Sequence, residues 1–199
     1  MFVPAKFQAS SDQAADFIRR FPFGTLCYQG AHGPSADHIP FAIVDKKLVG
    51  HVAWANPLWR EQAGKLVTAI FHGPHAFVDH RWYGRPQEHV PTWNYAVMHV
   101  TSKLQVIHEA RELYAILDAL SPSDMKPWED VAPYDLRATG VLEKSIVGLC
   151  LELDQIQVKF KLSQNRSSED RERVIAQLKN SPRHSDKELG EFMENCKHH

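Results

Sequence analysis

The sequence predicts an α+β protein, mainly β, in which an antiparallel barrel carries helices on its outside. Strand-like runs dominate the first half of the chain, and the helices that a parallel βαβ sheet would need between them are missing. Near the C-terminus, Ile156, Val158, Phe160 and Leu162 alternate with polar residues, which is typical of a strand with one solvated face. We expect a barrel domain over residues 1–163 and a helical extension packed on it over residues 164–199.

Periodicity and turn residues predict the elements in order. Predicted strands cover residues 24–28, 36–44, 47–54, 66–71, 96–107 (with a break at Thr101-Ser102), 146–153 and 156–162. Predicted helices cover residues 10–21, 58–63, 109–120 and 135–144, and two more begin after Ser167 and Ser185. The tight turn Asp45-Lys46 joins two of the strands into a hairpin. Residues 121–133 form a proline-containing loop.

The stretch from Ile70 to Tyr95 is rich in aromatic and turn-forming residues. Gly73-Pro74 and Gly84-Arg85-Pro86 are turn formers, because glycine permits unusual backbone angles and proline fixes one. Aromatic faces offer area for stacking, and His, Asn and Thr side chains offer hydrogen bonds around it. The stretch therefore either lines a site for a planar ligand with polar edges, or is a long loop that packs its aromatics into the core and a dimer interface.

Within this stretch, the strand parity separates polar from aromatic side chains. Thr92 and Asn94 share one face, whereas Trp93 and Tyr95 share the other. This pattern suits a site that has hydrogen-bonding groups on one side and an aromatic floor on the other. The alternative is an interface strand with Trp93 buried. Earlier in the chain, Asn56 follows a strand and either binds a ring edge or a phosphate, or caps its own turn.

A donor-rich segment from Lys161 to Arg166 leads into a predicted helix. A helix start offers free N–H groups and partial positive charge, and arginine can bind phosphate through two hydrogen bonds. The Walker pattern GxxxxGK[ST] is absent. The segment is either a phosphate cradle or a polar strand exit with a simple cap, and its density of donors favours the cradle.

Composition and missing motifs exclude several classes of protein. The net charge of −1 gives no global field towards nucleic acid or anionic membrane. With no run long enough to span a bilayer and no apolar core of a signal peptide, we expect a cytoplasmic protein with reduced cysteines. His72, His75 and His80 lie close in sequence, but HExxH is absent and no Cys joins them, so no metal site is predicted. GxSxG is also absent, and no catalytic residue is assigned.

The segments GHVAWANPLW, IFHGPHAFV, VPTWNYAVMHV and KLSQNRSSEDR together resemble the PaiB-type proteins, described as FMN-binding negative transcriptional regulators. The resemblance extends from the opening FVPAKF to the helix after KLSQNR. This family is similar to the FMN-binding split barrels that include pyridoxamine-phosphate oxidases and flavin reductases. The resemblance implies an antiparallel split β-barrel, a homodimer and a flavin site at the dimer interface.

The candidate cofactor-binding residues lie in these motifs and have side chains that can bind a flavin. They are His38, His51, Asn56, Trp82, Tyr83, Thr92, Trp93, Asn94, Lys161, Ser163, Gln164, Asn165 and Arg166. The chain departs from the family's pattern at two places. Residues 78–83 replace a Ser-Pro-Ser-Trp-Tyr type of segment, and Ala53-Trp54 replaces an Ala-Arg pair.

The resemblance implies an FMN-binding split-barrel protein that acts as a transcriptional regulator or as a flavin-dependent redox protein. The alternative is a regulatory module that uses the same pocket without flavin, with haem as another planar ligand. DNA is a weakly supported partner, because the sequence has no convincing helix-turn-helix and no basic stripe, and its terminal helices are charge-balanced.

Overall fold

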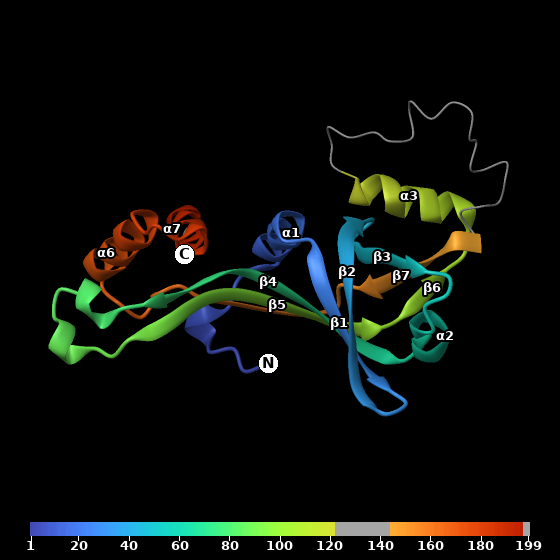
Figure 1. Ribbon diagram of the computed structural model, residues 1–199, viewed down its shortest axis with the longest axis horizontal. Coiled ribbons are helices and arrows are strands. Elements are labelled where there is room, and N and C mark those ends of the chain that lie inside the picture. Colours follow the sequence, from blue (N-terminus) through green and yellow to red (C-terminus); the bar gives the residue numbers. More distant parts are fainter. Residues whose placement is uncertain (122–143, 197–199) are drawn as a thin grey trace. The chain divides into compact units, whose positions relative to one another are not determined.

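The computed structural model describes residues 1–121 and 144–196 and is mainly antiparallel sheet with helices (Figure 1), which confirms the predicted fold class. The strands are β1 Phe23–Gly30, β2 Gly33–Val44, β3 Lys47–Ala53, β4 Leu66–Val78, β5 Thr92–Lys103, β6 Gln105–Ile107, β7 Ile146–Glu152 and β8 Gln155–Lys161. The α-helices are α1 Ser11–Arg20, α2 Leu58–Gln62, α3 Ala110–Leu120, α6 Ser168–Lys179 and α7 His184–Asn195. Short 3-10 helices are η1 Ala5–Phe7, η2 His80–Trp82 and η3 Pro86–Glu88.

Hydrogen-bonded neighbours give the strand order β6-β7-β3-β2-β1-β4-β5-β8. The chain divides into two compact units, and β4 and β5 run through both. Unit 1 comprises Met1–Ser11, His72–Met98 and Gln157–His199, and unit 2 comprises Asp12–Phe71 and His99–Ile156. The boundary expected between residues 163 and 164 stays a prediction.

The hairpin predicted at Asp45-Lys46 is confirmed. Val44 pairs with Lys47 across the turn, so β2 and β3 are joined by a two-residue loop. Asp45 and Lys46 have φ values of 48° and 63°. Positive φ at both central residues is what a type I′ turn requires, and this turn matches the twist of the flanking strands. The turn therefore sets the register in which β3 continues to His51.

In unit 2, α3 packs against β3 and β7. The contact is a small cluster in which Val49, Ile116 and Cys150 are buried together. Gly148 of β7 lies under the helix, because a Cβ built there would come within 2.8 Å of the Ile116 side chain and 2.9 Å of the Ile107 Cβ. The absence of a side chain at this position thus permits the close approach of α3 to the sheet.

In unit 1, α6 and α7 contact each other, and both lie over the same side of the strands there (Figure 1). The Phe160 and Phe192 rings meet edge to face at 5.2 Å, which joins β8 to α7. The predicted cap of α6 is confirmed, since the Ser167 hydroxyl accepts a hydrogen bond from the Asp170 amide. The start predicted at Ser185 is wrong: α7 begins at His184 with Arg183 in the cap position and no side-chain cap.

The segment from Ile70 to Tyr95 is not one long loop. β4 continues without interruption to Val78, and β5 begins at Thr92. Gly73-Pro74 therefore lies inside a strand and does not form the predicted turn. The pairing between β1 and β4 ends at Phe71, and proline is tolerated in a strand where one neighbour is missing, because its absent N–H breaks no ladder.

Two other predictions differ from the structure or fall outside it. The predicted break in the long strand after residue 96 exists but lies at Leu104, between β5 and β6, instead of at Thr101-Ser102. The loop predicted over residues 121–133 and the helix predicted over 135–144 lie almost wholly outside the described residues. Within residues 1–121 and 144–196, no helix has the length and apolar character that crossing a bilayer requires.

Substituting Gly148→Ala should destabilise unit 2 by about 1–3 kcal/mol, the usual cost of forcing a methyl group into a packed contact. The matched control is Gln105→Ala on the neighbouring strand β6. Gln105 is exposed, and its loss should change the free energy of unfolding by less than about 0.5 kcal/mol. Urea unfolding of both variants provides the comparison. Equal stability of Gly148→Ala and wild type would contradict the close packing described for α3.

Candidate functional site

The candidate residues fall into both units. Unit 2 holds His38, His51 and Asn56. Unit 1 holds Trp82, Tyr83, Thr92, Trp93, Asn94, Lys161, Ser163, Gln164, Asn165 and Arg166. The second group lies on β5, at the end of β8 and in the connection after β4, and contains most of the polar contacts described below.

The pleat of β5 separates its candidate side chains as the sequence predicts. Asn94 is 1% exposed, whereas Trp93 is 49% exposed. The alternative, an interface strand in which Trp93 is buried against a partner, stays a prediction, because the exposure of Trp93 refers to a single chain. Asn94 therefore lies on the face covered by α7, and Trp93 lies on the open face, so the two cannot contact a ligand from the same side of the strand.

Lys161 connects the end of β8 to the start of β5. Its ammonium donates hydrogen bonds to the Thr92 hydroxyl and, at 2.6 Å, to the Trp93 carbonyl. Burial lowers the pKa of Lys161, and the nearby charges of Lys159 and Arg166 lower it further. An ammonium has three N–H donors, so one remains for a ligand.

Arg166 lies between Tyr83 and a histidine that the sequence analysis missed. Its Nη1 is 2.8 Å from the Nδ1 of His89, and its guanidinium centre lies 4.8 Å from the centroid of the Tyr83 ring. The Tyr83 and His89 rings meet edge to face at 4.8 Å. His89 lies inside the aromatic stretch that the sequence singled out, but no motif or spacing distinguishes it from the other histidines there.

Asn94 and Ser163 form a buried pair under α7. The Asn94 amide donates to the Ser163 hydroxyl at 2.9 Å and to the Met193 sulfur at 3.7 Å. Ser163 has a φ of 65°, in the left-handed region. The Asn94 Oδ1 is buried and has no hydrogen-bond partner in the described chain. This pair therefore fixes the turn that leads from β8 to Arg166.

Three other candidates have no hydrogen bond to Lys161 or Arg166 within the described residues. Gln164 accepts a hydrogen bond from the Leu162 amide at 2.6 Å and donates to the Phe160 carbonyl, so its amide is occupied by its own strand exit. Asn165 is exposed, and Trp82 is half-buried in η2. Gln164 thus has the structural role that a simple polar strand exit would give it.

The start of α6 carries acidic side chains in addition to its cap. Glu169 and Asp170 lie in the first turn. The Asp170 carboxylate accepts a hydrogen bond from the Gly84 amide at 2.7 Å and lies 3.9 Å from the Nε2 of His89. The Gly84 hydrogen bond lowers the pKa of Asp170, with a smaller contribution from Ser167. This carboxylate offsets much of the positive potential of the helix start, so the guanidinium and ammonium groups supply the positive charge here.

A hollow of about 250 Å³ lies on the open face of unit 1 and is lined by His72, Gly73, His75, Trp93, Tyr95, Ala96 and Val97. The Trp93 indole donates to the Nδ1 of His75 at 3.3 Å, and their rings lie 5.8 Å apart. The indole of Trp93 thus provides a partly exposed aromatic surface whose orientation is fixed by a hydrogen bond.

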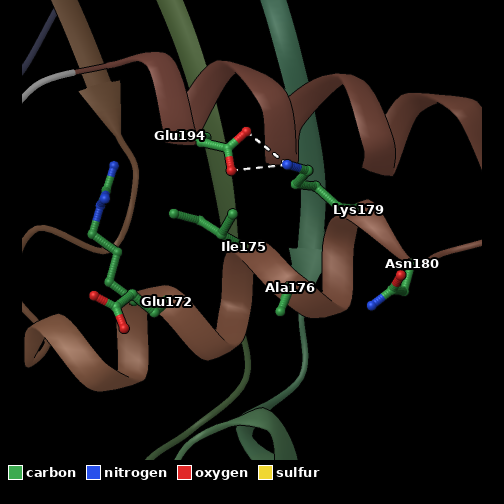
Figure 2. A pocket seen from close by; sticks show the side chains of 7 residues that line it. Glu172, Ile175, Ala176, Lys179, Asn180 and Glu194 are labelled. Carbon is green, nitrogen blue, oxygen red and sulfur yellow. Dashed lines mark hydrogen bonds and ion pairs between the residues drawn. The ribbon is translucent and has the colours of Figure 1, made fainter.

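A larger hollow of about 480 Å³ lies between α6 and α7 (Figure 2). Lys179 is bonded to both carboxylate oxygens of Glu194, at 2.8 and 2.7 Å, across this hollow. Arg171 and Glu172 supply the other charges of its lining. Since two cations face two carboxylates, this hollow offers no net positive charge for a phosphate.

In unit 2, Asn56 is tied to a hydrogen-bonded network. Its Nδ2 donates to Asp37 at 3.0 Å, and its Oδ1 accepts from the Leu58 amide at 2.9 Å. The second contact is the turn cap that the sequence offered as one alternative. Asp37 also accepts a hydrogen bond from the Tyr28 hydroxyl at 2.7 Å, which raises the pKa of Tyr28 to about 12.

The two candidate histidines of unit 2 differ in their surroundings. The Nδ1 of His38 lies 3.1 Å from the Thr25 hydroxyl. His51 has a buried Nδ1 without a hydrogen-bond partner among the described residues, and burial lowers its pKa.

Nearby in sequence, the Arg60 guanidinium lies 4.0 Å over the Trp59 ring and 5.4 Å from Trp54. A guanidinium thus lies beside the position where Trp54 replaces the arginine of the Ala-Arg pair.

Comparison with known proteins identifies relatives along most of the chain. Residues 1–155 match the family model described as "Putative FMN-binding domain". The chain is 33% identical to "Protease synthase and sporulation protein PAI 2" of Bacillus subtilis (strain 168) over 205 residues, which covers 98% of this chain and 97% of that protein.

Two solved structures share the fold at lower sequence identity. The FAD and haem binding protein from Mycobacterium smegmatis has a TM-score of 0.62 and 20% identity, with 78% of this chain and 73% of that chain covered. The flavocytochrome Anf3 from Azotobacter vinelandii has a TM-score of 0.56 and 12% identity, with 79% and 74% covered. At these identities the two structures support the split-barrel fold alone.

Replacing Asp37→Asn should lower the pKa of Tyr28 from about 12 towards its ordinary value of 10.0, because the carboxylate charge beside the hydroxyl is lost. Since the folded-state pKa of Tyr28 is raised, the stability that this contact contributes is present below pH 10 and is lost as the pH rises through 12. Ultraviolet titration of tyrosinate measures the change, and Tyr28→Phe identifies which transition belongs to Tyr28. An unchanged high-pH transition in Asp37→Asn would contradict the assignment.

Proposed function

The chain belongs to the PaiB-type family of FMN-binding split-barrel proteins, and we propose that it binds FMN through the cations Lys161 and Arg166. FMN carries a phosphate with close to two negative charges, and a site for it must neutralise that charge. Lys161 ends β8 and Arg166 lies in the connection to α6, near enough that the charge of Arg166 lowers the pKa of Lys161. These side chains fit the phosphate of FMN.

The observation that carries this proposal is the absence of a carboxylate partner. In unit 1, Arg81 is paired with Asp79, Arg173 with Glu169 and Lys179 with Glu194. Lys161 and Arg166, by contrast, contact only neutral acceptors within the described residues. A partly buried ammonium beside other cations is destabilised in its charged form, and an anion bound nearby would remove that penalty.

The open face of β5 supplies the aromatic part of the proposed site. A planar ring system such as the isoalloxazine of FMN stacks favourably on an aromatic face, and Trp93 offers a partly exposed one. Bound flavin would supply redox chemistry, while the residues of this chain bind and orient it.

We also propose that a second copy of the chain completes the site. The hollow at Trp93, about 250 Å³, is smaller than the roughly 300–1,000 Å³ of most ligand pockets. Unit 1 also exposes Phe2, Phe77 and Val90, at 82%, 42% and 70%. Exposed aromatic and apolar side chains beside an incomplete pocket are typical of a surface that a partner covers.

Haem is the competing planar ligand. Histidine is an axial ligand of haem iron, and His72 and His75 line the hollow. The absorption spectrum of the purified protein separates the two ligands, because bound flavin absorbs in the blue and haem gives a Soret band. We expect the flavin spectrum after incubation with FMN.

Arg166→Ala and Lys161→Ala should each weaken FMN binding by roughly one to two powers of ten, because a charge-assisted hydrogen bond contributes about 1.5–3 kcal/mol. Lys179→Ala is the matched control, since Lys179 is a cation of the same unit that is neutralised by Glu194. Fluorescence titration with FMN measures the affinity, and thermal melting verifies the fold. If Arg166→Ala and Lys161→Ala bind FMN as wild type does, the proposed phosphate site is wrong.

The homodimer should give twice the chain mass in light scattering at micromolar concentration. Trp93→Asp should shift the protein towards monomer, because a carboxylate would replace an exposed aromatic side chain on the proposed interface. Lys187→Asp on α7 is an exposed control that introduces the same charged residue outside this face. A monomer mass for the wild-type protein would contradict the proposed homodimer.

A further inference from the structure

Arg166 is held on two sides before any ligand is considered. The Tyr83 ring lies against one face of its guanidinium, at 4.8 Å, and the Nδ1 of His89 lies 2.8 Å from Nη1. Tyr83 is 2% exposed. An arginine side chain has many rotamers and loses entropy when a ligand fixes it, so fixing it before binding lowers the cost of binding an anion.

The hydrogen bond with Arg166 fixes the tautomer of His89. A guanidinium has no acceptor and stays protonated, so the Nδ1 of His89 must accept the hydrogen bond and Nε2 must carry the proton. That Nε2 lies 3.9 Å from the Asp170 carboxylate. Asp170 is itself anchored by the Gly84 amide. Polar side chains therefore extend from the first turn of α6 past His89 to Arg166, with a hydrogen bond between His89 and Arg166 and a longer separation between Asp170 and His89.

The edge of Arg166 that best binds oxyanions is left open. Its Nε and Nη2 have no acceptor within residues 1–121 and 144–196. In two other arginines of this unit, Nε and Nη2 both contact a carboxylate. Those of Arg81 contact Asp79, and those of Arg183 contact Asp186. His89 thus binds the one corner of the guanidinium that leaves this fork available.

We propose that His89 is a positioning residue which, together with the ring of Tyr83, holds Arg166 ready for phosphate and so makes the site prefer FMN to riboflavin. This inference rests on the proposed function, because it assigns Arg166 to the phosphate of FMN. Riboflavin has the same ring system without the phosphate. A residue that acts through Arg166 must therefore change the preference between the two flavins, whereas a residue that only supports the fold must change both affinities.

The first experiment measures the dissociation constants of FMN and riboflavin for wild type, His89→Leu and His89→Asn. His89→Leu should weaken FMN by about two- to ten-fold, the value of one hydrogen bond, and leave riboflavin unchanged. His89→Asn should restore the preference, because its amide oxygen can accept from Arg166 near the position of Nδ1. Equal weakening of both flavins in His89→Leu, or wild-type preference in it, overturns the proposal.

Tyr83 offers a second matched pair. Tyr83→Phe should keep the preference for FMN, because the ring remains and the Tyr83 hydroxyl has no hydrogen-bond partner among the described residues. Tyr83→Leu should reduce the preference, because it removes the aromatic face under the guanidinium. Thermal melting of each variant identifies any loss of fold. A folded Tyr83→Leu with the wild-type preference contradicts the role of the ring.

Nuclear magnetic resonance tests the positioning without any flavin. The ring nitrogen shifts of His89 should show the Nε2–H tautomer, and the Arg166 Nε–H signal should exchange with water faster in His89→Leu than in wild type. A wild-type protein that binds neither flavin refutes the proposed function, while these two signals still decide whether His89 holds Arg166. An Nδ1–H tautomer, or an Arg166 signal that is indifferent to His89, overturns the inference.

Discussion

The alternation of side chains along β5 is the constraint on which the candidate site depends. Because neighbouring residues of a strand point to opposite faces, Asn94 is buried under α7 while Trp93 stays on the open face. Lys161 then bonds to the strand itself, through the Thr92 hydroxyl and the Trp93 carbonyl. The cation is thereby fixed to the same strand that carries the aromatic surface, and neither could move without the other.

A second consequence of this alternation is that one buried side chain links the sheet to the cation cluster. Asn94 bonds to Ser163, and Ser163 has the left-handed φ that turns the chain out of β8. Non-glycine residues pay for this conformation unless the surroundings hold it. The turn then delivers Arg166 to Tyr83 and His89. The buried contact between Asn94 and Ser163 thus positions Arg166, whose Nε and Nη2 have no acceptor within the described residues.

The elements of the fold follow closely from local sequence signals, and the failures have a physical cause. The hairpin at Asp45-Lys46 and the cap at Ser167 depend on residues a few positions apart, so the sequence shows them. Gly73-Pro74 resembles a turn, but it lies in a strand because β4 has lost its β1 neighbour there, which is a tertiary fact. Local patterns carry no information about which strand edges are unpaired.

The candidate site was predictable in part for the same reason. Lys161 and Arg166 were identifiable as a dense set of donors close together in sequence. His89, however, meets Arg166 across 77 residues of sequence, and nothing at that distance marks one histidine among its neighbours. Gln164 had the right residue type, but it bonds to its own strand exit, a choice that only the backbone conformation decides.

The distribution of charge on α6 bears on whether this chain binds DNA, which stays a prediction. A protein gains affinity for a duplex by neutralising phosphates with cations and releasing counterions. On α6, Arg173 is paired with Glu169 and Lys179 with Glu194, so these cations would have to exchange a carboxylate for a phosphate. Lys161 and Arg166 need no such exchange, because they contact only neutral acceptors within the described residues. The ion pairs of α6 are thus consistent with the prediction that any binding to DNA is weak.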